Sequence, residues 1–215
     1  MIQLPENTYY GKRIPKEKFY SHLEVPATIK QSFVSDIDSI IWLNKLSSTT
    51  LNIAAGEKVK EIALLEVTLK TKEYNKLLFQ FIDKNIPLYV VYLLRFASEE
   101  QLLVNYKEPI AGKPNAFKLA VPSVTDWVKE NSLELRVEGL NLDSLYEGFV
   151  RQIVGLQIDD DAYIDVKVQI EGRCDMEKLE RRIAILENKK RNEKQFNKQL
   201  EIAEEIRRLK KDREA

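Results

Sequence analysis

The sequence predicts an α/β (α+β) fold, in which a mixed sheet of about four to five strands is flanked by helices and followed by a C-terminal coiled-coil helical hairpin. Residues 58–70 alternate between apolar and polar side chains, as a half-buried strand does. Residues 88–96 are almost continuously apolar, which is typical of a central strand covered on both faces. From residue 175 onward, apolar residues follow the three-and-four spacing of a coiled coil. The predicted domains are a globular domain at 1–155, a linker with a possible extra strand at 156–174, and a coiled coil at 175–215.

The N-terminal quarter is predicted to contain helices and no strand. Residues 1–15 form an irregular arm, because two prolines and a glycine interrupt them. A short helix follows at 16–23, and a longer one begins at Pro26 and ends at about Leu46. Apolar side chains repeat at helical spacing in the longer helix: Phe33, Ile37, Ile40, Ile41 and Leu43. The polar stretch at 44–53 is interpreted as an ordered connector, with a binding loop as the alternative.

Further elements follow the first predicted strand. Residues 73–86 predict an amphipathic helix that ends at Pro87, and residues 101–106 predict a strand that pairs with 88–96 as a hairpin. Another short strand is expected at 117–121. The clearest helix covers 140–155, where Asn141 is a good N-cap and Gly155 can close the helix in a left-handed conformation.

The C-terminal stretch predicts two helices. The seam formed by Met176, Leu179, Ile183 and Leu186 stops at a charged stretch, 187–194, and apolar order resumes afterwards. A stripe that stops and restarts favours an antiparallel helical hairpin over one long rod. Residues 164–170 alternate and are the candidates for the extra strand.

Composition excludes several classes of function. Lys and Arg number 34, as do Asp and Glu, so the charge of the whole chain does not indicate nucleic-acid binding. A single cysteine, Cys174, excludes an internal disulfide, and a single histidine, His22, leaves few routes to nucleophilic or transition-metal chemistry. The acidic run 159–161 lacks the spacing of a calcium loop, so no metal and no cofactor are predicted. With neither a secretory signal nor a membrane-length apolar run, a cytoplasmic location is expected.

Two groups of basic residues are candidates for nucleic-acid binding. Near the N-terminus, Lys12, Arg13 and Lys16 lie among tyrosines, a combination suited to phosphate contacts and base stacking, and Lys45 is the charge of the 44–53 stretch. The second group lies at the tip of the predicted hairpin: Lys189, Lys190 and Arg191. The alternative for both groups is a solvated surface.

One weak catalytic pattern is present at 66–70. Restriction-endonuclease-like nucleases place an acidic residue and a lysine two apart on a strand that a helix follows, where they hold Mg²⁺ and activate water. Glu66 matches the acid, Thr68 stands where that lysine is expected, and Lys70 is two residues further on. We therefore expect no enzymatic activity, with a divergent Mg²⁺-dependent nuclease as the alternative.

Four polar residues lie off the apolar stripe of the 140–155 helix and are the candidates for binding a partner: Asp143, Glu147, Arg151 and Gln152. The stripe itself is interpreted as core packing against the sheet.

Several segments carry a family resemblance. They are 12–15 (KRIP) with 18–20 (KFY), 41–47 (IWLNKLS) with 50–53 (TLNI), and 140–147 (LNLDSLYE) with 149–153 (FVRQI), together with the C-terminal coiled coil. The chain resembles a bacterial and archaeal family of the DUF4391 type, a domain of unknown function. Its members are often encoded beside Swi/Snf-type helicases and DNA methyltransferases in restriction or anti-phage defence clusters.

The resemblance implies an accessory or adaptor subunit of such a system, acting through protein–protein contacts. The expected partner is a helicase or methyltransferase of the same gene cluster, with a homodimer through the coiled coil as a further expectation. The alternatives are the Mg²⁺-dependent nuclease and a DNA-binding module. No membrane partner is expected.

Overall fold

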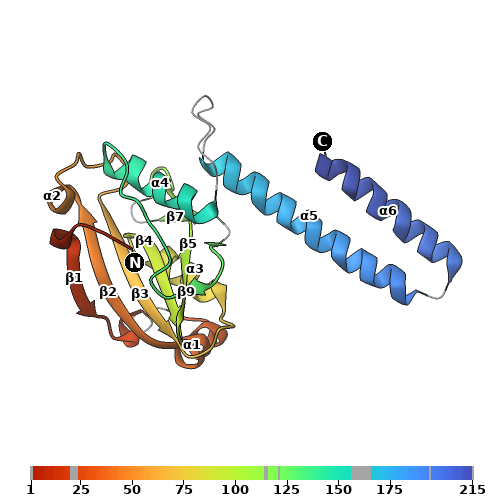
Figure 1. Cartoon of the computed structure of the whole chain (residues 1–215), viewed down its shortest axis with the longest axis horizontal. Coiled ribbons are helices and arrows are strands. Elements are labelled where there is room, and N and C mark those ends of the chain that lie inside the picture. Colours follow the sequence, from red (N-terminus) through yellow and green to blue (C-terminus); the bar gives the residue numbers. More distant parts are fainter. Residues whose placement is uncertain are drawn as a thin grey trace. The chain divides into compact units, whose positions relative to one another are not determined.

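A computed structural model describes residues 2–19, 24–113, 116–120, 122–155, 166–193 and 195–214 (Figure 1). The chain divides into two compact units, which we call the first unit, Met1–Val166, and the second unit, Lys167–Ala215. Each has a hydrophobic cluster of its own. No helix in the described part combines the length and the apolar character that crossing a bilayer requires.

The first unit is built on a mixed sheet, which has seven strands within the described residues. They are β1 (Tyr9–Arg13), β2 (Ile37–Ser47), β3 (Glu61–Leu69), β4 (Tyr89–Phe96), β5 (Glu99–Val104), β8 (Ser123–Val124) and β9 (Val128–Lys129). The order is β1-β2-β3-β4-β5-β8, and β9 also pairs with β5. Neighbouring strands are antiparallel except β3 and β4, which are parallel and joined through α3 (Lys76–Asn85). A small separate ribbon pairs β6 (Lys107–Pro109) with β7 (Phe117–Leu119).

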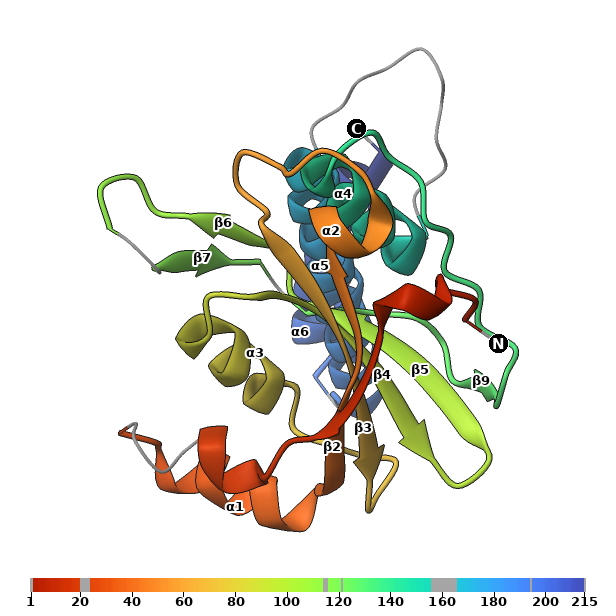
Figure 2. The same ribbon diagram turned by 90° about the vertical axis from the view of Figure 1, so that its left-hand side faces the viewer.

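Helices α1 (Ala27–Ser35) and α3 cover one face of the sheet (Figure 2). Their apolar side chains, among them Phe33 and Phe79, form one core with the residues that β3 and β4 direct to this face. The strand predicted within 58–70 is confirmed as β3, and its alternate residues Ala63, Leu65, Val67 and Leu69 all belong to this core. The buried strand β4 also matches its prediction, since its first six residues are buried on both faces.

Helix α4 (Leu142–Val154) packs on the opposite face. The ring of Tyr146 on α4 lies 4.8 Å from the ring of Tyr89 on β4. The next residue along β4, Val90, belongs to the core on the first face, so Tyr89 points to the opposite face. Both predicted ends of this helix are confirmed. The Asn141 side chain accepts a hydrogen bond from the amide of Ser144, and Gly155 has a φ of 71°.

The predicted helix from Pro26 to Leu46 is wrong beyond Ser35, because residues 37–47 form the eleven-residue strand β2. Its register against β3 shifts twice, between Ile37 and Ser39 and between Trp42 and Asn44. Each shift displaces the inward-facing residues by one position, so the alternation of period two is lost. The isoleucines of β2 are then three and four residues apart, which is the spacing of one face of a helix.

The N-terminal arm also differs from its prediction. Residues 6–8 form a 3₁₀ turn, Glu6–Thr8, and the next five form the edge strand β1. All five residues of β1 are exposed, so no apolar pattern marks the strand, and its backbone pairing with β2 decides the structure. The short helix predicted at 16–23 is a 3₁₀ turn, Lys16–Phe19, while residues 20–23, including His22, lie outside the described part.

The connector at 44–53 is ordered. Residues 44–47 end β2, and a single turn of helix, α2 (Ser48–Leu51), follows. Ser47 caps this turn by accepting from the amide of Thr50, whose hydroxyl in turn accepts from the amide of Ser47. Asn52 closes it with a φ of 54°.

The second unit is a helical hairpin, as predicted. Helix α5 (Val166–Asn192) and helix α6 (Phe196–Glu214) pack through Ile183, Ile202 and Ile206. Ion pairs of 2.9 Å also join the two helices, Arg182 with Glu205 and Lys210 with Glu187.

The extra strand predicted at 164–170 is wrong for residues 166–170, which begin α5. A helix satisfies its own backbone hydrogen bonds, whereas a strand needs a neighbour to pair with. The acidic run at 159–161 belongs to residues 156–165, which lie outside the described part.

Candidate functional site

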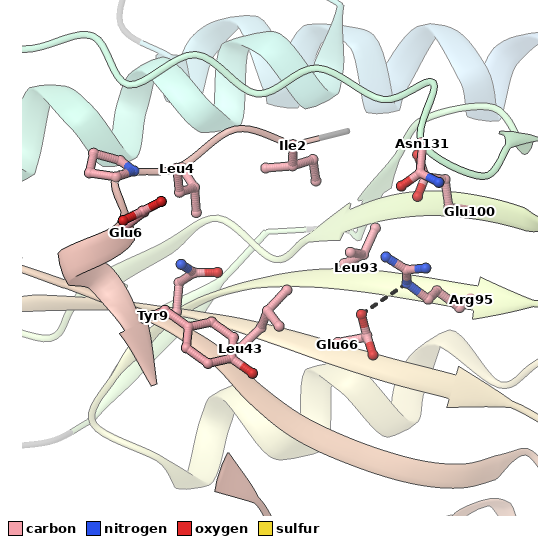
Figure 3. A pocket seen from close by; sticks show the side chains of 12 residues that line it. Ile2, Leu4, Glu6, Tyr9, Leu43, Glu66, Leu93, Arg95, Glu100 and Asn131 are labelled. Carbon is pink, nitrogen blue, oxygen red and sulfur yellow. Dashed lines mark ion pairs between the residues drawn. The ribbon is translucent and has the colours of Figure 1, made fainter. Parts of the chain in front are cut away.

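A pocket of about 500 Å³ opens between the N-terminal segment and the face of the sheet that α1 and α3 leave free (Figure 3). We call it the N-terminal pocket. Its apolar lining is Ile2, Leu4, Pro5, Tyr9, Leu43 and Leu93. Its polar lining is Glu6, Asn44, Glu66, Arg95, Glu100 and Asn131. All of these residues belong to the first unit.

Strand register brings the charged residues of the pocket together. Glu66 on β3 stands opposite Leu93 on β4, and Arg95, two residues further along β4, stands opposite Glu100 on β5. Residues that are paired or two apart share one face of a sheet. All four side chains therefore point to the pocket side.

Arg95 lies at the centre of several carboxylates. Its Nε is 2.9 Å from Oε2 of Glu66, an electrostatic contact without the alignment of a hydrogen bond, and its Nη1 donates to Glu130. Glu100 is only 2% exposed, and its Oε1 accepts from the amide of Leu133 at 2.9 Å. The guanidinium is thus neutralised by residues of its own chain.

The structure separates the two weak catalytic candidates. Glu66 faces the N-terminal pocket, whereas Lys70 follows the end of β3 and donates from its ammonium to the carbonyl of Val34 at 2.8 Å. Thr68, where a nuclease lysine is expected, is the register partner of Arg95. Within the described residues no group of three His, Cys, Asp or Glu side chains could hold a metal ion. The arrangement around Glu66 is an ion-pair cluster.

The N-terminal basic candidates do not form one patch of free charges. Lys45 pairs with Glu61 at 2.7 Å, and Lys16 donates to the carbonyl of Ile37 at 2.8 Å. Lys12 and Arg13 lie on the exposed edge strand β1. The ammonium of Lys12 is 4.7 Å from the centre of the Tyr10 ring, which in turn packs against Trp42.

The other basic group lies in the second unit. Lys189, Lys190 and Arg191 occupy the exposed last turn of α5, beside the turn of the hairpin. Positive charge at the C-terminal end of a helix interacts favourably with the helix dipole, so these residues also have a structural role.

Two of the four partner-binding candidates on α4 hold the first unit together instead. The carboxylate of Asp143 accepts from the amides of Glu57 at 2.6 Å and Val59 at 2.7 Å. The amide group of Gln152 accepts from the backbone N–H of Arg136 at 2.8 Å and donates to the carbonyl of the same residue at 3.0 Å. These contacts fasten the segments at 57–59 and 136 to α4.

Glu147 and Arg151 are partly buried on the same helix. Glu147 lines a small hollow of about 20 Å³ with Asp143 and Tyr89. The structure therefore brings Asp143 and Glu147 together, while Gln152 is engaged with the segment before α4.

A buried charged network was not foreseen from the sequence. Lys107 and Asp83 are both fully buried, with their charged atoms 3.9 Å apart. The ammonium of Lys107 donates to the carbonyls of Asp83 and Ile86, at the C-terminal end of α3. It also lies 4.4 Å from the centre of the Phe117 ring. The Asp83 carboxylate accepts from the side-chain amide of Asn105 at 2.5 Å.

Burial perturbs the pKa of both groups. Loss of hydration raises the pKa of the Asp83 carboxyl to about 7, although the nearby Lys107 charge acts in the opposite direction. Loss of hydration likewise lowers the pKa of Lys107 to about 8, against the effect of Asp83. One signal in the sequence could have indicated this site: Asp83 lies four residues after the core residue Phe79, on the buried stripe of α3.

The comparisons with known proteins identify a family and no activity. Neither the curated proteins nor the solved structures give a match. The family profile described as "Domain of unknown function (DUF4391)" matches residues 2–212. Because this match covers both units, the chain belongs to the DUF4391 family.

Proposed function

We propose that this chain is an accessory or adaptor subunit of a helicase-associated restriction or anti-phage defence system, and that it acts through protein–protein contacts. The observation that carries the proposal is the small core of the hairpin. Helices of 27 and 19 residues pack through three buried isoleucines and three partly buried leucines within the described part of the second unit.

Such a core is small for a unit of this size. Helices in water gain most of their stability from packing an apolar face, and small scaffolds usually need a staple or a partner. In the described part of this unit, Ile185 is 67% exposed and Leu200 is 46% exposed. Each lies two residues from a seam residue, Ile183 or Ile202, and therefore on the outer side of its helix. A partner protein that covers these exposed side chains adds apolar burial outside the seam between the two helices.

The partner is a helicase or a methyltransferase encoded beside this chain, an assignment that rests on the family resemblance alone. A second copy of the chain is the competing occupant of the same surface. The nuclease and DNA-binding alternatives stay predictions, since no specific arrangement within the described residues favours them over the adaptor role.

A pull-down tests the proposal. Tagged full-length protein is expected to retain the neighbouring helicase or methyltransferase, and a chain ending at residue 155 is expected to lose it. Light scattering of the full-length protein alone distinguishes a dimer of this chain from a complex with another protein. If the shortened chain retains the partner equally well, the hairpin does not carry the contact.

A further inference from the structure

We propose that the N-terminal pocket binds a positively charged nitrogen group, an alkylammonium or a guanidinium, carried on an apolar stem. This inference concerns the first unit and does not depend on the adaptor role proposed for the hairpin.

The shape and walls of the pocket suit an apolar stem. A volume of about 500 Å³ lies within the range of small-molecule sites. Three leucine side chains line it, Leu4 from the N-terminal segment, Leu43 from β2 and Leu93 from β4 (Figure 3). These side chains surround a methylene chain and leave the polar group of the ligand at the charged floor.

The charges of the pocket favour a cation. Its lining holds three carboxylates, those of Glu6, Glu66 and Glu100, against one guanidinium, that of Arg95. Arg95 is already engaged with Glu66 and Glu130, so it is not available as a receptor for an anion.

Two carboxylate oxygens remain to receive the ligand. Within the described residues, Oε1 of Glu66 and Oε2 of Glu100 make no hydrogen bond, whereas the other oxygen of each group is engaged. Glu100 is 98% buried, and it is among the residues that line the pocket. A buried carboxylate that lacks full hydrogen bonding is stabilised by a cationic donor, and such charge-assisted bonds are the strong ones.

Two kinds of ligand carry a positively charged nitrogen group on an apolar stem. A free amine or guanidine of low molecular weight carries it, and so does a lysine or arginine side chain of another protein. Hexylammonium represents the first kind, and a blocked peptide with one central lysine represents the second.

Calorimetric titration of the full-length protein tests the proposal. Hexylammonium is expected to bind at least about tenfold more tightly than hexanol or hexanoate, which share its stem but lack its charge. Binding of the free amine alone identifies a small-molecule site, and binding of the lysine peptide as well identifies a site for a protein side chain. Equal affinity for hexanol or hexanoate, or no binding of any probe, overturns the proposal.

Variants locate the binding. Glu66→Gln and Glu100→Gln are each expected to weaken hexylammonium binding about tenfold, because each removes one of the two receiving charges. A glutamine at 100 can still accept from the amide of Leu133, so this variant keeps the internal bond. Glu134→Gln is the matched control, since Glu134 is exposed and does not line the N-terminal pocket. If the control weakens binding as much as the two variants, the site lies elsewhere.

Discussion

At the scale of single residues, the buried pair of Asp83 and Lys107 loses hydration free energy but gains new contacts inside the protein. Removing two charges from water is unfavourable, but the Lys107 ammonium meets two carbonyls where helix α3 ends and lies over the ring of Phe117. The negative end of the helix dipole favours the cation there. The pair connects α3 to β6, which explains why the chain keeps charges inside this part of its core.

The raised pKa of Asp83 predicts how stability depends on pH. Its pKa is about 4 in the unfolded chain and about 7 in the folded protein, so between these values the folded protein binds a proton that the unfolded chain releases. The free energy of unfolding therefore falls as pH rises from about 4 to 7. Urea unfolding at a series of pH values measures this change in the free energy of unfolding.

Asp83→Asn is expected to remove most of this pH dependence, since the amide does not titrate. Asp126→Asn is the control, because Asp126 is exposed and the slope should persist in that variant. An unchanged slope in Asp83→Asn would show that another group is responsible.

Asp143 predicts a second effect at this scale. Asp143→Ala removes the acceptor of the amides of Glu57 and Val59, so we expect a loss of about 2 kcal/mol in the free energy of unfolding. Gly56→Ala should have a similar effect, because its Cβ would lie 2.2 Å from Oδ1 of Asp143. Thermal unfolding compares both with Asp126→Ala. A loss below about 0.5 kcal/mol in Asp143→Ala would contradict this structural role.

At the scale of elements, the sequence predicts those helices and strands whose packing leaves a regular side-chain pattern. Strand β3 keeps one face apolar from Ala63 to Leu69, where it packs in the core, and α4 carries both of its capping residues. Strand β2 has the apolar spacing of a helix because its register against β3 shifts twice. Edge strand β1 is held by backbone pairing, which leaves no mark in the side chains.

The same limits apply to the site. Glu66 was a candidate from its position on β3, but its partner Arg95 is 29 residues away in the sequence (95 minus 66) and reaches it only through the strand register. Lys107 lies between Tyr106 and Glu108 in a stretch without an apolar pattern, so nothing in the sequence indicated its burial.

The small core of the hairpin leads to a prediction about α5 and α6. Ile202→Ala removes one of the three buried side chains in the described part of this unit, so we expect the helical signal in circular dichroism to fall at lower urea concentration. Both tryptophans, Trp42 and Trp127, lie in the first unit, so their fluorescence reports on that unit alone. The urea midpoint measured by tryptophan fluorescence is expected to stay the same. If it shifts as much as the midpoint measured by circular dichroism, the two units unfold together.

At the scale of the whole molecule, the adaptor role predicts the absence of nuclease activity. We expect no cleavage of DNA with Mg²⁺ or Mn²⁺, because the charge nearest Glu66 is the guanidinium of Arg95. Gel assays on linear and supercoiled DNA measure this. Cleavage that disappears in Glu66→Ala would contradict the accessory role and favour the nuclease.

The affinity of the full-length protein for the proposed helicase partner tests the central claim most directly. Ile185→Glu with Leu200→Glu places one charge on the outer side of each helix of the hairpin, and we expect binding to weaken at least about a hundredfold. Leu77→Glu is the matched control, since Leu77 is 60% exposed on the first unit and the same charge there should leave the affinity unchanged. If the double variant binds the helicase as tightly as the wild-type chain, the hairpin is not the contact surface.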